Sequence, residues 1–176
     1  MNRKHGFTLI ELIVTLALAA ILLTIGVPTF QEMIRNNRAA THANEFMSTL
    51  NLARSEAVKR GRRVALCKSS DNATCVTTGA WDQGWIVFVD ANNDADAAGD
   101  NIIRVHGALS GGNTLQGSTD VANYISYSPD GVVRLTSGAS LAANTVLTFG
   151  LCVSGQKSTI EIGQTGRTRV NKIACS

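Results

Sequence analysis

Aromatic residues and prolines are scarce in this chain of 176 residues, which has two tryptophans, two tyrosines and two prolines. So few rings give little support for base stacking, through which many proteins hold single-stranded nucleic acid. No low-complexity linker and no internal repeat divides the sequence either. The length therefore predicts one domain with a single hydrophobic core.

Catalytic motifs are also missing. The sequence contains no G-x-S-x-G nucleophile motif and no glycine-rich phosphate-binding loop, and His42 and His106 stand alone in it. We therefore expect neither enzymatic activity nor a cofactor.

The chain does contain a long apolar run near its N-terminus. Residues 7–27 carry a single charge, on Glu11, and as a helix they would measure about 31 Å, close to the thickness of a bilayer core. Arg3 and Lys4 precede the run, which places the N-terminus in the cytoplasm by the positive-inside rule. A carboxylate inside a membrane helix is costly without a partner, so Glu11 needs a cation.

Gly6 lies before this run, whereas a secretory signal peptide is cut at small residues after its apolar stretch. The segment from Gly6 and Phe7 to Glu11, with Pro28 further on, resembles the class III leader of type IV prepilins and type II secretion pseudopilins. The resemblance implies that a prepilin peptidase cuts after Gly6 and methylates Phe7. It also implies that Glu11 pairs with the N-terminal amine of a neighbouring pilin in the filament.

The rest of the sequence predicts one helix followed by strands. Apolar residues recur every three or four positions, and Gly61 then follows two cationic residues, as at many helix ends. We therefore expect a helix over residues 7–60 and an α+β domain. The turn Pro129-Asp130-Gly131 predicts a hairpin. Segments rich in β-branched residues predict strands at 63–68, 85–89, 102–106, 124–128, 132–136, 146–151, 158–162 and 167–173.

Three internal segments extend the resemblance. LARSEAVKRG at the end of the helix, GWIVFVDANND and YISYSPDGVV resemble the FimT and GspH group of minor pilins. The family implies a type IV pilin-like fold, in which one long N-terminal helix packs on an antiparallel β-rich domain. Its divisions would be a leader at 1–6, a transmembrane and filament-core segment at 7–28, and a periplasmic domain at 29–176. That domain would contain a helix at 29–60 and a β domain at 62–176.

Four cysteines, Cys67, Cys75, Cys152 and Cys175, lie in the part expected outside the inner membrane, where disulfides persist. Four cysteines allow three pairings, and local pairing favours Cys67 with Cys75 and Cys152 with Cys175. The sequence lacks the C-x2-C pairs of a zinc ribbon.

An acidic segment at 90–100 holds four aspartates, and its first, third and fifth residues match the first ligand spacings of an EF-hand loop. The match then fails, because Ala95 stands where a glycine is needed and Asn101 where a glutamate is needed. We interpret the segment as a solvated acidic loop and predict no metal site.

The net charge of +3 conceals a segregation of charge along the chain. Residues 35–68 hold eight basic and two acidic residues, residues 71–130 hold one and eight, and residues 134–176 hold five and one. A nearly neutral total is therefore compatible with a basic surface.

Near the C-terminus, Gly166-Arg167-Thr168-Arg169 places two arginines two residues apart behind a glycine. On a strand, this spacing projects both guanidinium groups from one face, where their donor forks suit phosphates. The motif resembles the G-R-x-R signature of FimT proteins that bind DNA for uptake in natural transformation, which implies that Arg167 and Arg169 bind DNA. A strand edge protected from aggregation by basic residues is the alternative.

Three further residues are candidates for the same surface. Lys172 lies near the motif, and Arg62 and Arg63 would extend a track of phosphate contacts if they share its face. Together with Lys59 and Arg60, these two arginines form one basic cluster, and the alternative for all four is that they complement the helix dipole without any ligand.

These patterns together predict a minor type IV pilin that binds double-stranded DNA without sequence preference. It would be anchored in the inner membrane with its domain in the periplasm, and would later enter an extracellular pilus. Other pilins and the prepilin peptidase are the expected protein partners. Two alternatives stay open: a minor pilin that primes pilus assembly by protein contacts alone, and a GspH-like pseudopilin of a type II secretion machine.

The leader motif gives a direct prediction about processing. Mass spectrometry of the protein extracted from membranes should show an N-terminal Phe7 that carries one methyl group, and replacement of Gly6 should leave the precursor uncut. An unprocessed Met1 in cells with an active prepilin peptidase would contradict the assignment.

Overall fold

The computed structural model describes the backbone of residues 8–141, 146–153 and 156–174. Three of the predicted sites, Gly6, Phe7 and Cys175, lie outside the described residues, as do the side chains of Cys152 and Lys172. The pairing expected for Cys152 and Cys175 therefore stays a prediction.

Helix α1 runs without interruption from Leu9 to Arg60, about 78 Å at the usual rise per residue. Its first turn is closed by a capping box: the Thr8 hydroxyl accepts a hydrogen bond from the Glu11 amide, and the Glu11 carboxylate accepts one from the Thr8 amide at 2.9 Å. Gly61 ends the helix in the left-handed conformation, with φ of 62°. The expected helix is thus confirmed over its described part.

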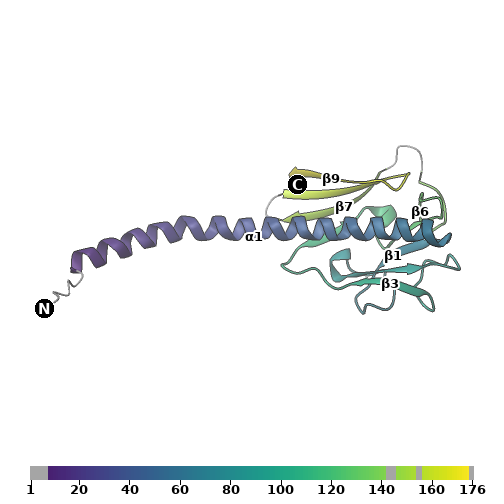
Figure 1. The fold of residues 1–176 in the computed structure, drawn as a ribbon, viewed down its shortest axis with the longest axis horizontal. Coiled ribbons are helices and arrows are strands. Elements are labelled where there is room, and N and C mark those ends of the chain that lie inside the picture. Colours follow the sequence, from purple (N-terminus) through teal and green to yellow (C-terminus); the bar gives the residue numbers. More distant parts are fainter. Residues whose placement is uncertain (1–7, 142–145, 154–155, 175–176) are drawn as a thin grey trace.

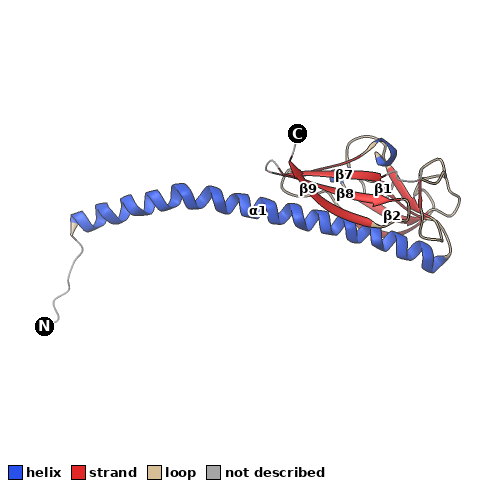
Figure 2. Cartoon of the chain, turned by 90° about the horizontal axis from the view of Figure 1, so that it is seen from above, coloured by secondary structure: helices blue, strands red, loops and turns tan. Residues whose placement is uncertain are grey.

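The two halves of α1 lie in different surroundings. Large apolar side chains up to Met33 are exposed, and Figures 1 and 2 show this half extending away from the rest of the molecule. By length and composition it could cross a membrane. Burial begins at Ala39, where the helix enters the domain.

Nine strands form two antiparallel sheets beside the second half of α1 (Figure 1). The first sheet has the order β3-β2-β1-β5-β6, with β1 at Val64–Lys68, β2 at Trp85–Val89, β3 at Asn101–His106, β5 at Tyr124–Tyr127 and β6 at Val133–Arg134. The second has the order β4-β7-β8-β9, with β4 at Thr114–Gly117, β7 at Val146–Val153, β8 at Gln156–Gly163 and β9 at Thr168–Ala174. Short 3-10 helices occupy Trp81–Gln83 (η1) and Thr119–Val121 (η2). The α+β prediction is confirmed, although the sequence did not indicate β4.

The hydrophobic core lies where α1 meets both sheets. Phe46 of α1 makes edge-to-face contacts with Trp81, Trp85 and Phe149, so that one ring touches η1, β2 and β7. A second, smaller cluster covers the opposite face of the first sheet, where Ala97 of the acidic loop packs with residues of β1, β2 and β5. The strands β1, β2 and β5 of the first sheet are therefore buried on both faces.

The loop after β1 is closed by the disulfide between Cys67 and Cys75, which confirms that pairing. Inside it, Asp71 accepts hydrogen bonds from the Thr74 hydroxyl and amide and from the Ala73 amide, and these bonds hold the pKa of Asp71 well below its ordinary value. Lys68 reaches under the loop and donates to the carbonyls of Thr77 and Gly79. Cys75 packs against the second cluster, so the disulfide anchors the loop to that side of the first sheet.

Removal of this disulfide should destabilise the domain, because the unfolded chain regains the entropy of an open loop. For so short a loop, the double variant Cys67→Ala/Cys75→Ala should lose about 2–3 kcal/mol of unfolding free energy. Tryptophan fluorescence during denaturant unfolding reports on it, since both tryptophans are buried in the core. A variant that unfolds at the same denaturant concentration as the parent would show that the bridge does not constrain the unfolded chain.

Candidate nucleic-acid interface

The GRTR motif spans the end of the turn between β8 and β9 and the first two residues of β9. Gly163 donates its amide to the Arg167 carbonyl at 3.1 Å, and Gly166 donates to the Gly163 carbonyl at 2.8 Å. Gly166 has φ of 74°, the left-handed conformation that closes a three-residue hairpin loop. The sequence prediction of a glycine turn before the two arginines is confirmed.

This turn is held against two other elements. A Cβ atom on Gly166 would lie 2.6 Å from the Gly131 carbonyl oxygen and 3.0 Å from Arg54 Nε, so the backbone approaches as closely as only glycine permits. Arg54 of α1 donates to that same carbonyl at 3.0 Å. The amide of Val133 in β6 donates to the Gln164 carbonyl at 3.2 Å. The turn is therefore fixed to the helix and to the β5–β6 hairpin of the other sheet.

The two arginines of the motif are exposed, Arg167 at the end of this turn and Arg169 at the start of β9. Arg167 lies one residue before β9, and Arg169 lies opposite Glu161 of β8. The flanking residues of Glu161, Ile160 and Ile162, are buried toward α1, so Arg169 belongs to the outer face of the sheet. Among the residues that the structure describes, neither arginine has an ion pair or a side-chain hydrogen bond. Both charges are available to a ligand.

The cations at the end of α1 differ in how far they are already neutralised. Lys59 and Arg60 pair with Glu56, at 3.7 and 2.5 Å. Arg62 is exposed. Arg63, with 15% of its side chain exposed, lies 4.0 Å from the buried carboxylate of Asp90. Of the two arginines predicted here, only Arg62 thus presents an unpaired charge among the described residues.

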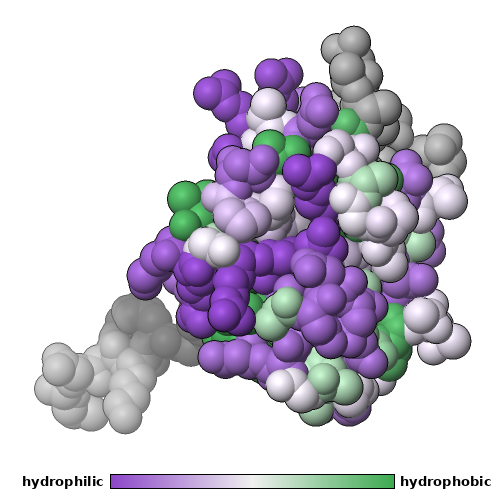
Figure 3. All heavy atoms as spheres, turned by 90° about the vertical axis from the view of Figure 1, so that its right-hand side faces the viewer, coloured by the Kyte–Doolittle hydropathy of each residue, from purple (hydrophilic) through white to green (hydrophobic). Residues whose placement is uncertain are grey.

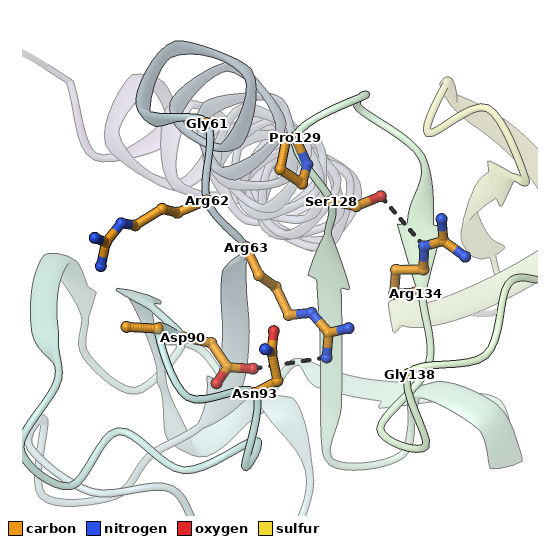
Figure 4. A pocket seen from close by; sticks show the side chains of 10 residues that line it. Gly61, Arg62, Arg63, Asp90, Asn93, Ser128, Pro129, Arg134 and Gly138 are labelled. Atoms are coloured by element: carbon orange, nitrogen blue, oxygen red, sulfur yellow. Dashed lines mark hydrogen bonds and ion pairs between the residues drawn. The ribbon is translucent and has the colours of Figure 1, made fainter.

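A hollow of about 410 Å³ separates the end of α1 from the β5–β6 hairpin. Figure 4 shows three arginines around it: Arg62, Arg63 and Arg134 of β6. Arg134 donates to the hydroxyls of Ser128 and Ser140 and lies 3.9 Å from Asp130. The sequence did not indicate Arg134, because only the hairpin brings β6 beside the end of the helix.

The structure therefore gathers most of the predicted basic residues at one end of the domain. The β8–β9 turn, β6 and the end of α1 all lie at the end farthest from the N-terminus (Figure 1). Seen from that end, the surface is largely hydrophilic (Figure 3). We call the exposed, unpaired residues Arg62, Arg167 and Arg169 the distal arginines.

The acidic loop borders the same hollow, and it is not solvated throughout as expected. Asp90 is 1% exposed, and its Oδ2 accepts a hydrogen bond from the Tyr124 hydroxyl at 2.6 Å. Burial, together with the nearby carboxylates of Asp90 and its neighbours, raises the pKa of Asp100 above its ordinary value. The expectation of a solvated loop is wrong for Asp90 because Tyr124, from a strand distant in sequence, provides a buried partner.

Solved structures with the same architecture are minor pilins. The type IV minor pilin FimU of Pseudomonas aeruginosa (strain PAO1) matches in one crystal form with a TM-score of 0.57 and 21% identity, over 79% of this chain and 92% of that chain. A second crystal form of FimU gives 0.53 and 22%, over 75% and 91%. At this level of identity, the likeness establishes the fold alone, which is that of a type IV pilin-like protein. A search of curated protein sequences returns no significant relative.

Two family models match the sequence. Residues 1–27 match the prokaryotic N-terminal methylation motif, and residues 42–166 match the type II transport protein GspH family. The second match spans more than half of the chain, so the protein belongs to the GspH family, which comprises minor pilins and pseudopilins.

The close approach at Gly166 predicts that adding one methyl group at this position destabilises the domain. Gly166→Ala forces a side chain into a left-handed conformation and onto the Gly131 carbonyl, which should cost roughly 2–5 kcal/mol of unfolding free energy. Gly163→Ala is the matched control, because nothing lies within 4 Å of its Cβ position. Thermal unfolding of both variants tests this, and equal melting temperatures would contradict the close packing.

Proposed function

We propose that this minor pilin binds double-stranded DNA through its distal arginines and serves DNA uptake in natural transformation. The observation that carries the proposal is the pair Arg167 and Arg169, exposed and unpaired among the described residues on a turn that Gly166 fixes to the helix. Because the backbone of the turn is already fixed, binding costs conformational entropy in the two arginine side chains but little in the backbone that carries them.

The chemistry of these groups suits a phosphate backbone. Each guanidinium is cationic and offers a planar fork of donors to phosphate oxygens. Arg62 adds a third charge at the same end of the domain. Arg134 lines the same hollow as Arg62, and Lys172 follows Arg169 by three residues in the sequence.

Recognition would be independent of base sequence. Both tryptophans and both tyrosines are buried, so the described part of the chain offers no exposed ring of these types for stacking. The helix that ends near the distal arginines is packed on two sheets, and we infer contacts with phosphates rather than insertion into a groove.

The same proposal implies a cellular location for the domain. The methylation motif and the apolar first half of α1 support a pilin anchored in the inner membrane and cut by a prepilin peptidase. The domain would then lie in the periplasm and later in a pilus among other pilins. There the end farthest from the membrane helix carries the DNA-binding residues.

An assembly role without DNA is the second candidate, and one observation favours it. The exposed apolar side chains of α1 from Leu9 to Met33 need other helices or lipid around them, and in a filament neighbouring subunits would supply them. Within that role, Glu11 keeps its predicted pairing with the amine of a neighbouring pilin. In a type II secretion machine the same contacts would serve a pseudopilin. DNA binding at the distal arginines separates these functions.

Binding of duplex DNA by the full chain in detergent should be weak and sensitive to salt. We expect dissociation constants of roughly 1–100 μM at physiological salt, for duplexes of any sequence. Because each neutralised phosphate contributes about 0.9 to the logarithmic salt slope, Arg167→Gln/Arg169→Gln should reduce that slope by up to about two units. Fluorescence anisotropy over a salt series measures both quantities.

The matched control is Arg35→Gln/Arg104→Gln, which removes the same charge from two exposed arginines away from the distal end. It should bind DNA nearly as the parent does. In cells, the Arg167/Arg169 variant should lower transformation while pili still assemble. Equal losses in the two double variants would show a general charge effect, and no salt-dependent binding by the parent would leave the assembly role as the function.

A further inference from the structure

Three carboxylates of the loop between β2 and β3 converge on one point. Oxygen atoms of Asp90, Asp94 and Asp100 lie within 4.8 Å of one another. Asp90 follows directly after β2 and Asp100 directly precedes β3, so both ends of the loop are fixed in the sheet.

Two oxygens in this group are buried and unpaired. The side chain of Asp90 is fully buried. Its Oδ2 accepts a hydrogen bond from the Tyr124 hydroxyl, whereas its Oδ1 has no hydrogen-bond partner among the described residues. Asp100 Oδ2 is likewise buried and without a partner there. A buried carboxylate oxygen that has lost water and gained no donor is strongly unfavourable.

The charge in the group is also uncompensated. Among the described residues, one cation forms an ion pair with this cluster: Arg63, at 4.0 Å from Asp90. Against three carboxylates it leaves an excess of two negative charges when all are ionised. Like charges held this close repel each other unless a cation lies between them.

We propose that the loop at 90–100 binds a divalent cation, with Ca²⁺ as the ion that suits it best. Asp90, Asp94 and Asp100 each bring one carboxylate oxygen, a hard ligand, to the group, although the carboxylate of Asp94 also accepts hydrogen bonds from the Asn92 side chain and the Asp96 amide. Ca²⁺ accepts six to eight such ligands in irregular geometry, whereas Mg²⁺ requires a nearly ideal octahedron. Backbone carbonyls and water would fill the remaining positions, because the Asn92 amide oxygen already accepts a hydrogen bond from the Asp94 amide at 3.3 Å.

The backbone supports this assignment at the two points where the sequence pattern fails. Ala95 stands where an EF-hand loop needs glycine, yet it adopts the left-handed conformation with φ of 65°. The final glutamate of an EF-hand is missing, but Asp100, one residue earlier than that position, brings its carboxylate to the cluster. Ala97 packs into the second apolar cluster and holds the middle of the loop against the sheet.

The test uses the full chain in detergent after removal of metal ions with EDTA. Titration with CaCl2 by calorimetry should give a dissociation constant of about 0.01–1 mM, the range from sensor sites to extracellular modules. Tryptophan fluorescence should show a higher melting temperature in millimolar CaCl2 than in EDTA, and a smaller rise with MgCl2 at the same concentration.

Asp94→Asn and Asp100→Asn test the ligands, with Asp120→Asn, exposed and outside the loop, as the control for loss of one charge. Each ligand variant should weaken Ca²⁺ binding at least tenfold, and the control should bind as the parent does. In EDTA, Asp100→Asn should melt no lower than the parent, because it relieves repulsion; a residue with a purely structural role would lower the melting temperature in both solutions.

Three results would overturn the proposal. They are a parent that shows no heat of Ca²⁺ binding, a rise in melting temperature that Mg²⁺ reproduces in full, and a Ca²⁺ effect that persists unchanged in both ligand variants. The proposal does not rest on DNA binding, and the Arg167→Gln/Arg169→Gln protein should bind Ca²⁺ as tightly as the parent.

Discussion

The fold depends on one narrow face of α1. Its buried apolar residues follow the helical spacing of four and three positions: Ala39, Ala43, Phe46, Leu50, Ala53 and Ala57. The alanines let both sheets approach the helix backbone, and Phe46 fills the space between them through its contacts with η1, β2 and β7. Truncation of a core phenylalanine typically costs about 3–5 kcal/mol, a large part of the stability of a domain this size.

Because the helix joins the sheets, it also aligns the distal end. The β5–β6 hairpin belongs to the first sheet and the β8–β9 turn to the second, and they meet at the contact of Gly131 with Gly166. Arg54 of α1 donates to the Gly131 carbonyl at this point. The position of the distal arginines therefore depends on all three elements together. A substitution on the buried face of the helix should shift these arginines.

Local patterns in the sequence were sufficient for some features and insufficient for others, for physical reasons. The helix, its end at Gly61 and the hairpin at Pro129-Asp130-Gly131 follow from periodicity and turn chemistry, which are local. The segment 114–117 is short and lies among glycines, and only its pairing with β7 makes it a strand. Similarly, β6 is limited to two residues and not the five expected, because beyond Arg134 the chain turns back at Gly138.

The candidate sites divide in the same way. Exposure of Arg167 and Arg169 could be inferred from the motif, since a glycine turn and alternation on a strand are local rules. The burial of Asp90 could not be inferred, because it depends on Tyr124, more than thirty residues away in the sequence. The place of Arg134 could not be inferred either, because only the β5–β6 hairpin brings it beside the end of α1. The spacing of an EF-hand loop did not indicate Asp100 as a ligand, because its carboxylate reaches the cluster from the residue just before β3.

The three-residue turn at Gln164, Thr165 and Gly166 sets which face each residue of β9 occupies. One added or deleted residue in the turn would shift the ladder by one position, so that Arg169 would move to the face of Val170, which pairs with the buried Ile160. The molecule should thus tolerate many substitutions on the outer face of β9 but no change in the length of this turn. Among homologous chains, gaps in an alignment should avoid this turn even where the residues around it vary freely.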